Sequence, residues 1–167
     1  MTAVEDVISD LDAALERITA AAIRDDAERR RALREVLACI YELRAYREGP
    51  RRTLERVAYH QRARATTDGL ITEGIVWLRG NIVHLLVYDV VPKVRPLNPD
   101  PLTFPGEHTY PGSNLMWRRS AEVAVPSGGA NDDDRRELYD GHVAGRIVLE
   151  CLHSAYGFLV ADPGPTA

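Results

Sequence analysis

Hydrophobic residues recur every three or four positions at the start of the chain, which is the spacing of an amphipathic helix and close to a heptad. The stripe consists of Val4, Ile8, Leu11, Leu15, Ile18 and Ala22. A second helix is expected after Asp25 and Asp26, because carboxylates suit the positive N-terminal end of a helix. Its apolar positions are Leu33, Val36, Leu37, Ile40 and Leu43. The residues Glu-Gly-Pro at positions 48–50 end it.

Two further helices are expected. A short one runs through Leu54, Val57 and Gln61, and the sequence ATTDG at residues 65–69 offers a break and a cap. The next is expected over residues 70–89, where a helical projection gives three stripes. The core stripe is Ile71, Ile75, Leu78, Ile82, Leu85 and Leu86, and its flank is Val76, Arg79, Val83 and Val87. The third stripe, aromatic and polar, is Trp77, Gly80, Asn81, His84 and Tyr88.

The pattern then changes, because seven of the ten prolines fall within residues 92–126 and proline interrupts helices. We expect an ordered arm with two short strands, the better one over residues 115–125. Asn131 can cap a final helix that reaches at least Leu159. The predicted fold is therefore a single all-α domain over residues 1–167. It is a four- to five-helix bundle with a proline-rich, partly extended insertion at residues 92–130 before the last helix.

Composition and charge narrow the class of protein. The chain has 167 residues, 45% of them hydrophobic and 28% charged, with a net charge of −4, as in an ordinary globular domain. Residues 17–64 nevertheless carry thirteen arginines against seven acids, which could attract a phosphate backbone or simply form a solvated helical face. The acidic N-terminal sequence and the short apolar runs favour a cytoplasmic protein with no membrane partner.

Cysteine and histidine spacing argues against redox or metal chemistry. Cys39 and Cys151 each lie among apolar residues at helical spacing, which favours buried thiols over a disulfide or a nucleophile. The five histidines include no H-x3-H or H-E-x-x-H pair, and no C-x2-C occurs. No glycine-rich phosphate loop is present either. We therefore expect no metal and no cofactor.

The predicted helix over residues 70–89 is apolar around so much of its surface that it should be enclosed. One bundle cannot easily cover all of these faces, which predicts a two-fold homodimer through the third stripe or its valine flank. Polar groups inside such a helix cost free energy unless they have partners. Arg79, Asn81 and His84 are therefore either satisfied structural residues or a site.

The sequence Arg79-Gly-Asn-Ile-Val-His84 resembles the R-x4-6-H motif of the HEPN superfamily, which lies on a late helix of a helical unit. Together with MWRRSAEVAVP and YDGHVAGR further on, it is similar to a group of bacterial HEPN-like proteins over about residues 70–160. The resemblance implies an all-helical homodimer. In catalytic members, two such motifs face each other and cleave RNA without metal, often as toxins or defence components with a partner antitoxin.

The resemblance implies that Arg79, Asn81 and His84 are catalytic. A neutral imidazole can take the proton of an RNA 2′-hydroxyl, and a guanidinium can hold the phosphate. The two side chains leave one helix roughly 140° apart, so a dimer would be needed to align them. The alternative is that Arg79 pairs with a carboxylate such as Glu73 and that His84 is a satisfied interface histidine.

A second candidate binding site is Tyr139, His142 and Arg146, which recur at three and four residues on one helix face. The alternative is a polar seam packed against the proline-rich arm. Trp117, followed by two arginines, could stack a base or pin the arm to the bundle. Three functions stay open: a HEPN-like ribonuclease, a non-catalytic dimerisation or partner-binding module of the same class, and a structural or regulatory helical protein.

Overall fold

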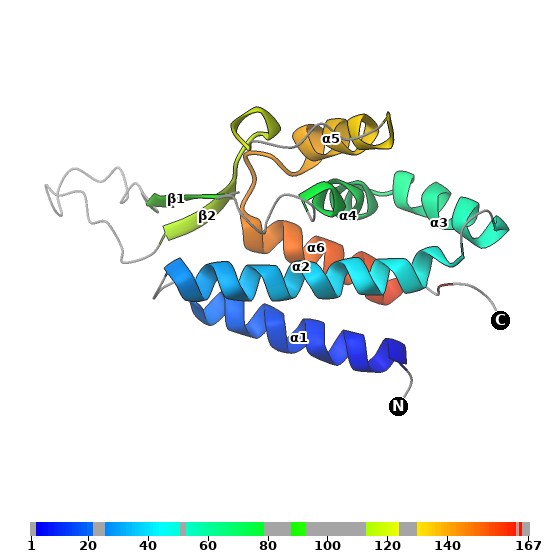
Figure 1. The fold of residues 1–167 in the computed structure, drawn as a ribbon, viewed down its shortest axis with the longest axis horizontal. Coiled ribbons are helices and arrows are strands. Elements are labelled where there is room, and N and C mark those ends of the chain that lie inside the picture. The colour runs from blue at the N-terminus through cyan, green and yellow to red at the C-terminus, as the bar shows by residue number, and fades with distance from the viewer. Residues whose placement is uncertain are drawn as a thin grey trace, which may run out of the picture.

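In its described residues, the computed structural model contains six α helices and one antiparallel pair of β strands (Figure 1). It describes residues 3–21, 26–50, 53–78, 88–92, 113–123 and 130–162, together with Gly164. The helices are α1 (Ala3–Ala21), α2 (Asp26–Glu48), α3 (Leu54–Arg64), α4 (Thr67–Trp77), α5 (Ala130–His142) and α6 (Val148–Ala161). The strands are β1 (Tyr88–Pro92) and β2 (Ser113–Trp117), and a short 3-10 helix spans Ser120–Glu122. The all-α class is thus confirmed.

Helices α1 and α2 form a pair that packs lengthwise, as the hydrophobic stripes predict (Figure 1). From α1, Leu11, Leu15 and Ile18 are buried between the helices, whereas Val4 and Ile8 are half-buried near the start of the helix. All five predicted apolar positions of α2 are buried. Burying each such side chain stabilises the fold by about 1.5–3 kcal/mol before entropy is counted, so the stripe alone accounts for the pairing.

Helix α4 lies at the centre of the other half of the molecule, where it contacts α2, α3, α5 and α6. Thr66 caps its N-terminus by accepting a hydrogen bond from the Gly69 amide at 3.0 Å, as the ATTDG break predicts. Gly69 also allows close approach, because a Cβ there would lie 2.2 Å from the Ala63 carbonyl oxygen. Every residue over 71–78 is buried. The chain itself therefore encloses this helix.

The prediction of one helix over residues 70–89 is wrong at its C-terminal end. Helix α4 ends at Trp77, and Tyr88 pairs with Trp117 at the start of an antiparallel β1–β2 ladder. Val90, Val91 and Pro92 favour this strand, since β-branched residues suit extended backbone and proline cannot continue a helix. Two short strands are present, as expected, but their predicted positions are wrong. Strand β2 covers only the first three residues of the expected 115–125 strand, which continues into a 3-10 helix at Ser120–Glu122, and β1 precedes the predicted insertion except for Pro92.

The prediction of one final helix is also wrong, because α5 ends at His142 and α6 begins at Val148. Gly145 has a positive φ of 75°, a conformation that breaks a helix and that glycine adopts at little cost. The linker also pairs with β2: Gly145 N donates to Trp117 O at 2.8 Å, and Trp117 N donates to Arg146 O at 3.0 Å. The break therefore supplies backbone partners to the end of β2.

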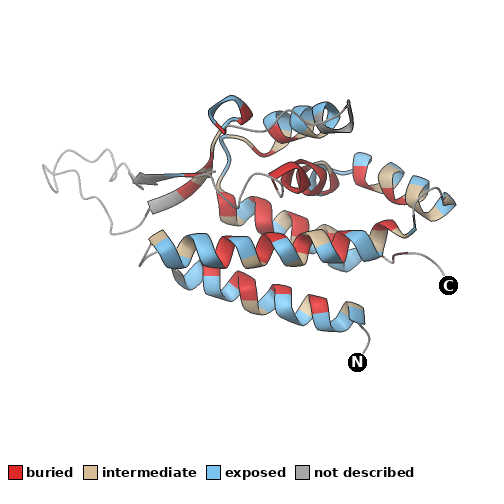
Figure 2. Ribbon diagram, in the orientation of Figure 1, coloured by how far each residue is buried: buried red, intermediate tan, exposed pale blue. Residues whose placement is uncertain are grey.

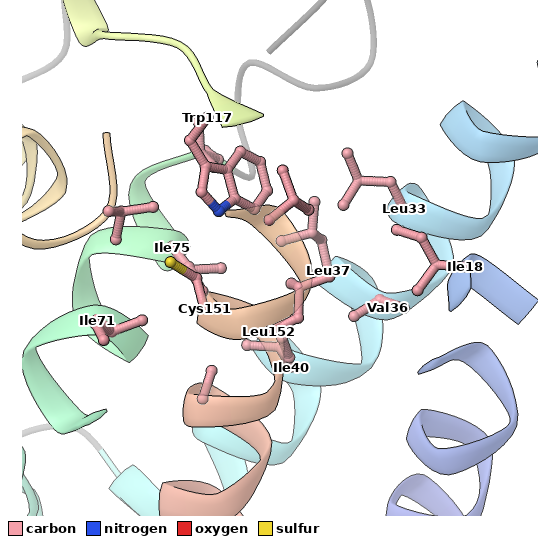
Figure 3. Packing of buried hydrophobic residues seen from close by; sticks show 14 of the residues in the cluster. Ile18, Leu33, Val36, Leu37, Ile40, Ile71, Ile75, Trp117, Cys151 and Leu152 are labelled. Atoms are coloured by element: carbon pink, nitrogen blue, oxygen red, sulfur yellow. The ribbon is translucent and has the colours of Figure 1, made fainter. Parts of the chain in front are cut away.

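Buried apolar residues form one continuous core through both halves (Figure 2). Figure 3 shows Trp117 from β2 lying over Ile75 of α4, Cys151 of α6 and Leu37 of α2. Helix α6 contacts α1, α2, α4 and β2, so it joins the α1–α2 pair to the rest of the bundle. Within the described part of the chain, none of the helices has the length and apolar character needed to cross a membrane.

Candidate functional site: an arginine-lined pocket beside a buried ion-pair network

The first predicted site, Arg79, Asn81 and His84, lies outside the described residues, as does Gly80. The structure does describe both flanks of the motif. Trp77 at the end of α4 is buried with its ring centroid 4.8 Å from that of Tyr139. Tyr88 at the start of β1 is buried too, and its hydroxyl donates to Asp26 Oδ1 at 3.1 Å. The motif is thus flanked on both sides by core residues.

This placement alters the basis for the predicted dimer. The third stripe was expected to lie along one helix, from Trp77 to Tyr88, and to face a partner. Instead, Trp77 and Tyr88 belong to different elements, and each is covered within its own chain. The enclosure of α4 over residues 71–78 likewise comes from the same chain. A homodimer stays a prediction, and it now depends on the HEPN resemblance alone.

The second predicted site is only partly accessible. Tyr139 is fully buried, and its hydroxyl donates to the carbonyl of Arg118, the residue after β2. Burial raises the pKa of Tyr139, and the charge of Asp140 raises it further. His142 is half-buried at the end of α5, while Arg146 is exposed and donates through Nη1 to the His142 carbonyl at 3.3 Å. The hydrogen bond from Tyr139 to Arg118 matches the alternative interpretation, in which these residues pack against the proline-rich segment instead of binding a ligand.

The structure brings together a charged network that the sequence analysis did not assemble. Arg44 of α2 forms a two-pronged ion pair with Glu73 of α4, with Nε to Oε1 at 2.7 Å and Nη2 to Oε2 at 3.0 Å. Its third nitrogen donates to Glu48 at 2.6 Å, and the hydroxyl of Tyr59 donates to Glu73 Oε1 at 3.1 Å. His60 Nε2 lies 2.9 Å from Glu48 Oε1. The network thereby joins α2, α3 and α4 at one point.

Burial makes these charges costly, and their mutual contacts offset the cost. Arg44 and Glu73 are 3% and 4% exposed, so each would be unfavourable alone. Burial acts to raise the pKa of Glu73, but the hydrogen bonds and charge of Arg44 outweigh it and hold that pKa below the ordinary value. The pKa of Tyr59 is raised, chiefly by burial and then by the negative charge of Glu73. Arg44 and Glu73 are therefore both charged, and Tyr59 is neutral.

A pocket of about 420 Å³ opens beside this network. Helix α3 supplies Arg56, Val57, His60, Gln61 and Arg64; α4 supplies Glu73; and α5 supplies Asp134, Arg135 and Leu138. The lining thus combines three guanidinium groups and a histidine with two carboxylates and two apolar side chains. Such a lining suits an anionic ligand that also has an apolar part.

Sequence reasoning missed the network because its partners are far apart in the chain. Arg44 and Glu73 are separated by 29 residues. A local signal existed: Glu73 interrupts the apolar face of α4, and Arg44 directly follows the buried Leu43. Glu73 was considered only as a partner for Arg79. In the structure, both of its oxygens already accept hydrogen bonds from Arg44.

The remaining candidates fall in the core. Trp117 is 2% exposed at the end of β2, where it cannot stack on a base. Cys151 is buried, and burial raises its thiol pKa to about 11; Cys39 is half-buried with a raised pKa. Among the residues that the structure describes, no group of three or more His, Cys, Asp or Glu side chains could hold a metal ion.

Comparisons with protein-family models, with curated proteins and with solved structures found no match to this chain.

Proposed function

We propose that this chain is a HEPN-like homodimeric ribonuclease that cleaves RNA without a metal ion and acts as a toxin or defence component in bacteria. The observation that carries the proposal is the Arg79-x4-His84 motif. It begins directly after α4, the most enclosed helix of an all-helical bundle. The HEPN resemblance expects such a motif on a late helix of a helical unit.

The residue types fit RNA cleavage by transesterification. His84 would take the proton of the 2′-hydroxyl, whose oxygen then attacks the adjacent phosphorus. The bond from phosphorus to the 5′-oxygen breaks, the 5′-oxygen takes up a proton, and a 2′,3′-cyclic phosphate remains. Arg79 would hold the phosphate oxygens through its planar fork, and Asn81 would orient them. Because the nucleophile belongs to the substrate, DNA of the same sequence should not be cleaved.

The test compares the wild type with His84→Ala and Arg79→Lys on single-stranded RNA and tRNA in EDTA. His84→Ala should abolish cleavage because the base is lost, and Arg79→Lys should abolish it because an ammonium lacks the fork. His142→Ala is the matched histidine control, and it should lower the rate much less than His84→Ala does. Equal rates for the wild type and His84→Ala, with both proteins folded by circular dichroism, would refute the proposed catalysis.

The alternative is a non-catalytic dimerisation or partner-binding module of the same class, with an antitoxin-like protein as a candidate partner. One observation favours it: β1 begins at Tyr88, so only residues 79–87 separate the end of the described α4 segment from the strand. A motif helix there would be at most about two and a half turns long. Absence of cleavage by a protein that is dimeric in light scattering would support this alternative.

A further inference from the structure

The arginine-lined pocket lies between α3 and α5, with α4 beneath it. Figure 1 shows α3, α4 and α5 grouped on the side of the molecule away from α1. None of the described lining residues belongs to the Tyr139, His142 and Arg146 set, and the Arg79–His84 motif lies outside the described part of the chain. Binding by the described lining residues does not require the proposed ribonuclease function.

Three basic side chains of the pocket follow one face of α3, and a fourth faces them from α5. Arg56, His60 and Arg64 are spaced four residues apart on α3, so they share one helix face at intervals of about 6 Å. Arg135 reaches the same pocket from α5. A ligand in the pocket would therefore meet guanidinium groups from two helices.

Most of the negative charge near these basic side chains is already neutralised. The Glu73 carboxylate, which forms part of the pocket wall, is held by Arg44 through both oxygens. Glu48 of α2 accepts one hydrogen bond from Arg44 and is paired with Arg56 at 2.9 Å. Together with the exposed Asp134, these groups give four arginines and three carboxylates among the described residues in and beside the pocket. These described groups thus carry one positive charge in excess, before any charge on His60.

Two of the arginines are available to a ligand. Within the described part of the chain, the side chains of Arg64 and Arg135 have neither a hydrogen-bond acceptor nor an ion-pair partner. Arg64 is exposed and Arg135 is half-exposed. By contrast, Arg62, which lies on another face of α3, is committed to Asp162 through two hydrogen bonds of 3.0 and 2.9 Å. The two available arginines of α3 and α5 therefore meet in the pocket.

We propose that this pocket binds a phosphate ester, with the phosphate oxygens held by Arg64 and Arg135 and the organic part packed against Val57 and Leu138. Guanidinium groups match the geometry of phosphate oxygens by donating two parallel hydrogen bonds. The two apolar side chains give the ligand's carbon skeleton a surface to cover. A volume of about 420 Å³ lies within the range of pockets for small molecules. The phosphate comes from a small organic phosphate or from a nucleic-acid backbone.

The test titrates the full chain by calorimetry with adenosine diphosphate, pyrophosphate, citrate and a single-stranded DNA hexamer, which has the phosphate backbone but lacks the 2′-hydroxyl that the proposed cleavage needs. Arg64→Gln and Arg135→Gln should each weaken phosphate binding about tenfold or more, because each removes a charge-assisted hydrogen bond. Arg34→Gln, at an exposed position on α2, removes the same charge and should change binding less than about twofold. Arg64 forms no hydrogen bond or ion pair with the described residues, so Arg64→Gln and the exposed Arg34→Gln should unfold at the wild-type temperature. Arg135 also attracts the Glu73 carboxylate at longer range, so Arg135→Gln should unfold at a slightly lower temperature.

The choice of ligands distinguishes the two possible sources of the phosphate. Binding of adenosine diphosphate without the hexamer identifies a small organic phosphate, and binding of the hexamer with the same arginine dependence identifies a nucleic-acid backbone. Three results would overturn the proposal: no binding at millimolar ligand, citrate binding as tightly as pyrophosphate, or an equal loss of affinity in Arg34→Gln. None of them bears on cleavage, so this test and the ribonuclease test fail independently.

Discussion

Replacing Glu73 with glutamine should reveal how much the buried network stabilises the fold. The substitution keeps the size and the oxygen that accepts from Tyr59, but its amide group faces the Arg44 guanidinium as donor against donor. Arg44 then remains buried with Glu48 as its only carboxylate partner among the described residues. Breaking a buried ion pair from one side costs about 3–5 kcal/mol. Because Arg44 keeps one partner, we expect the lower end, about 3 kcal/mol.

For a chain of this length, a loss of about 3 kcal/mol lowers the midpoint of thermal unfolding by about 6–12 °C. The measurement is urea or thermal unfolding followed by circular dichroism at 222 nm. Glu35→Gln is the matched control, since it breaks the Arg17–Glu35 pair, whose side chains are 55% and 40% exposed. An exposed pair contributes about 0–1 kcal/mol. Equal losses from Glu73→Gln and Glu35→Gln would refute the claim that the network is buried and coupled.

The pH dependence gives a second readout of the same pair. The pKa of Glu73 in the folded protein is lower than its ordinary value of 4.5. A depressed pKa means that the stabilisation is fully present above pH 4.5 and is lost as the pH falls through the folded-state pKa. The difference in stability between the wild type and Glu73→Gln should therefore be constant near neutral pH and shrink below about pH 4. A difference that grows on acidification would contradict the assigned pairing.

Two further predictions concern glycines and thiols. Gly157→Ala should stabilise the protein by about 0.5–1 kcal/mol, because Gly157 lies inside α6 and an added Cβ would meet nothing within 4 Å. Gly145→Ala should destabilise it by about 1 kcal/mol, because Gly145 has a positive φ of 75°; equal effects in chemical denaturation would contradict the linker geometry. A thiol reagent at pH 8 should modify Cys39 before Cys151, whose burial raises its pKa to about 11; faster labelling of Cys151 in peptide mapping would show that the core opens there.

The helices that could be predicted from the sequence are those marked by patterns of nearby residues. The stripe of α1 and the apolar positions of α2 repeat at helical spacing over many residues, and Thr66 lies in a recognisable capping position. The sequence did not predict that α4 ends at Trp77 and that a strand begins at Tyr88, because an apolar run rich in valine fits a helix or a strand equally well. What decides for the strand at Tyr88 is its partner Trp117, which periodicity cannot reveal. The break at Gly145 likewise depends on hydrogen bonds to the same strand.

The candidate site shows the same limit more sharply. Arginine and glutamate within apolar helices predict that partners exist, since unpaired buried charges are costly. They do not say which partners, because Arg44 could reach any carboxylate that the fold brings near. The pocket is even harder to predict from the sequence, since Arg64 and Arg135 line the same pocket only after α3 and α5 pack on α4. Their sequence environment is that of ordinary exposed arginines.

The charges that stabilise this region and the charges that face its pocket are carried by different residues. Arg44 and Glu73 are buried and fully engaged with each other. Their pairing also removes a repulsive carboxylate from the pocket wall, because the Glu73 charge is matched where it lies. Arg64 and Arg135 form no hydrogen bond or ion pair with the described residues, although the charge of Arg135 attracts Glu73 at longer range. The buried charges therefore neutralise each other, while guanidinium groups at the pocket surface remain able to bind a ligand. An anion-binding pocket requires this arrangement.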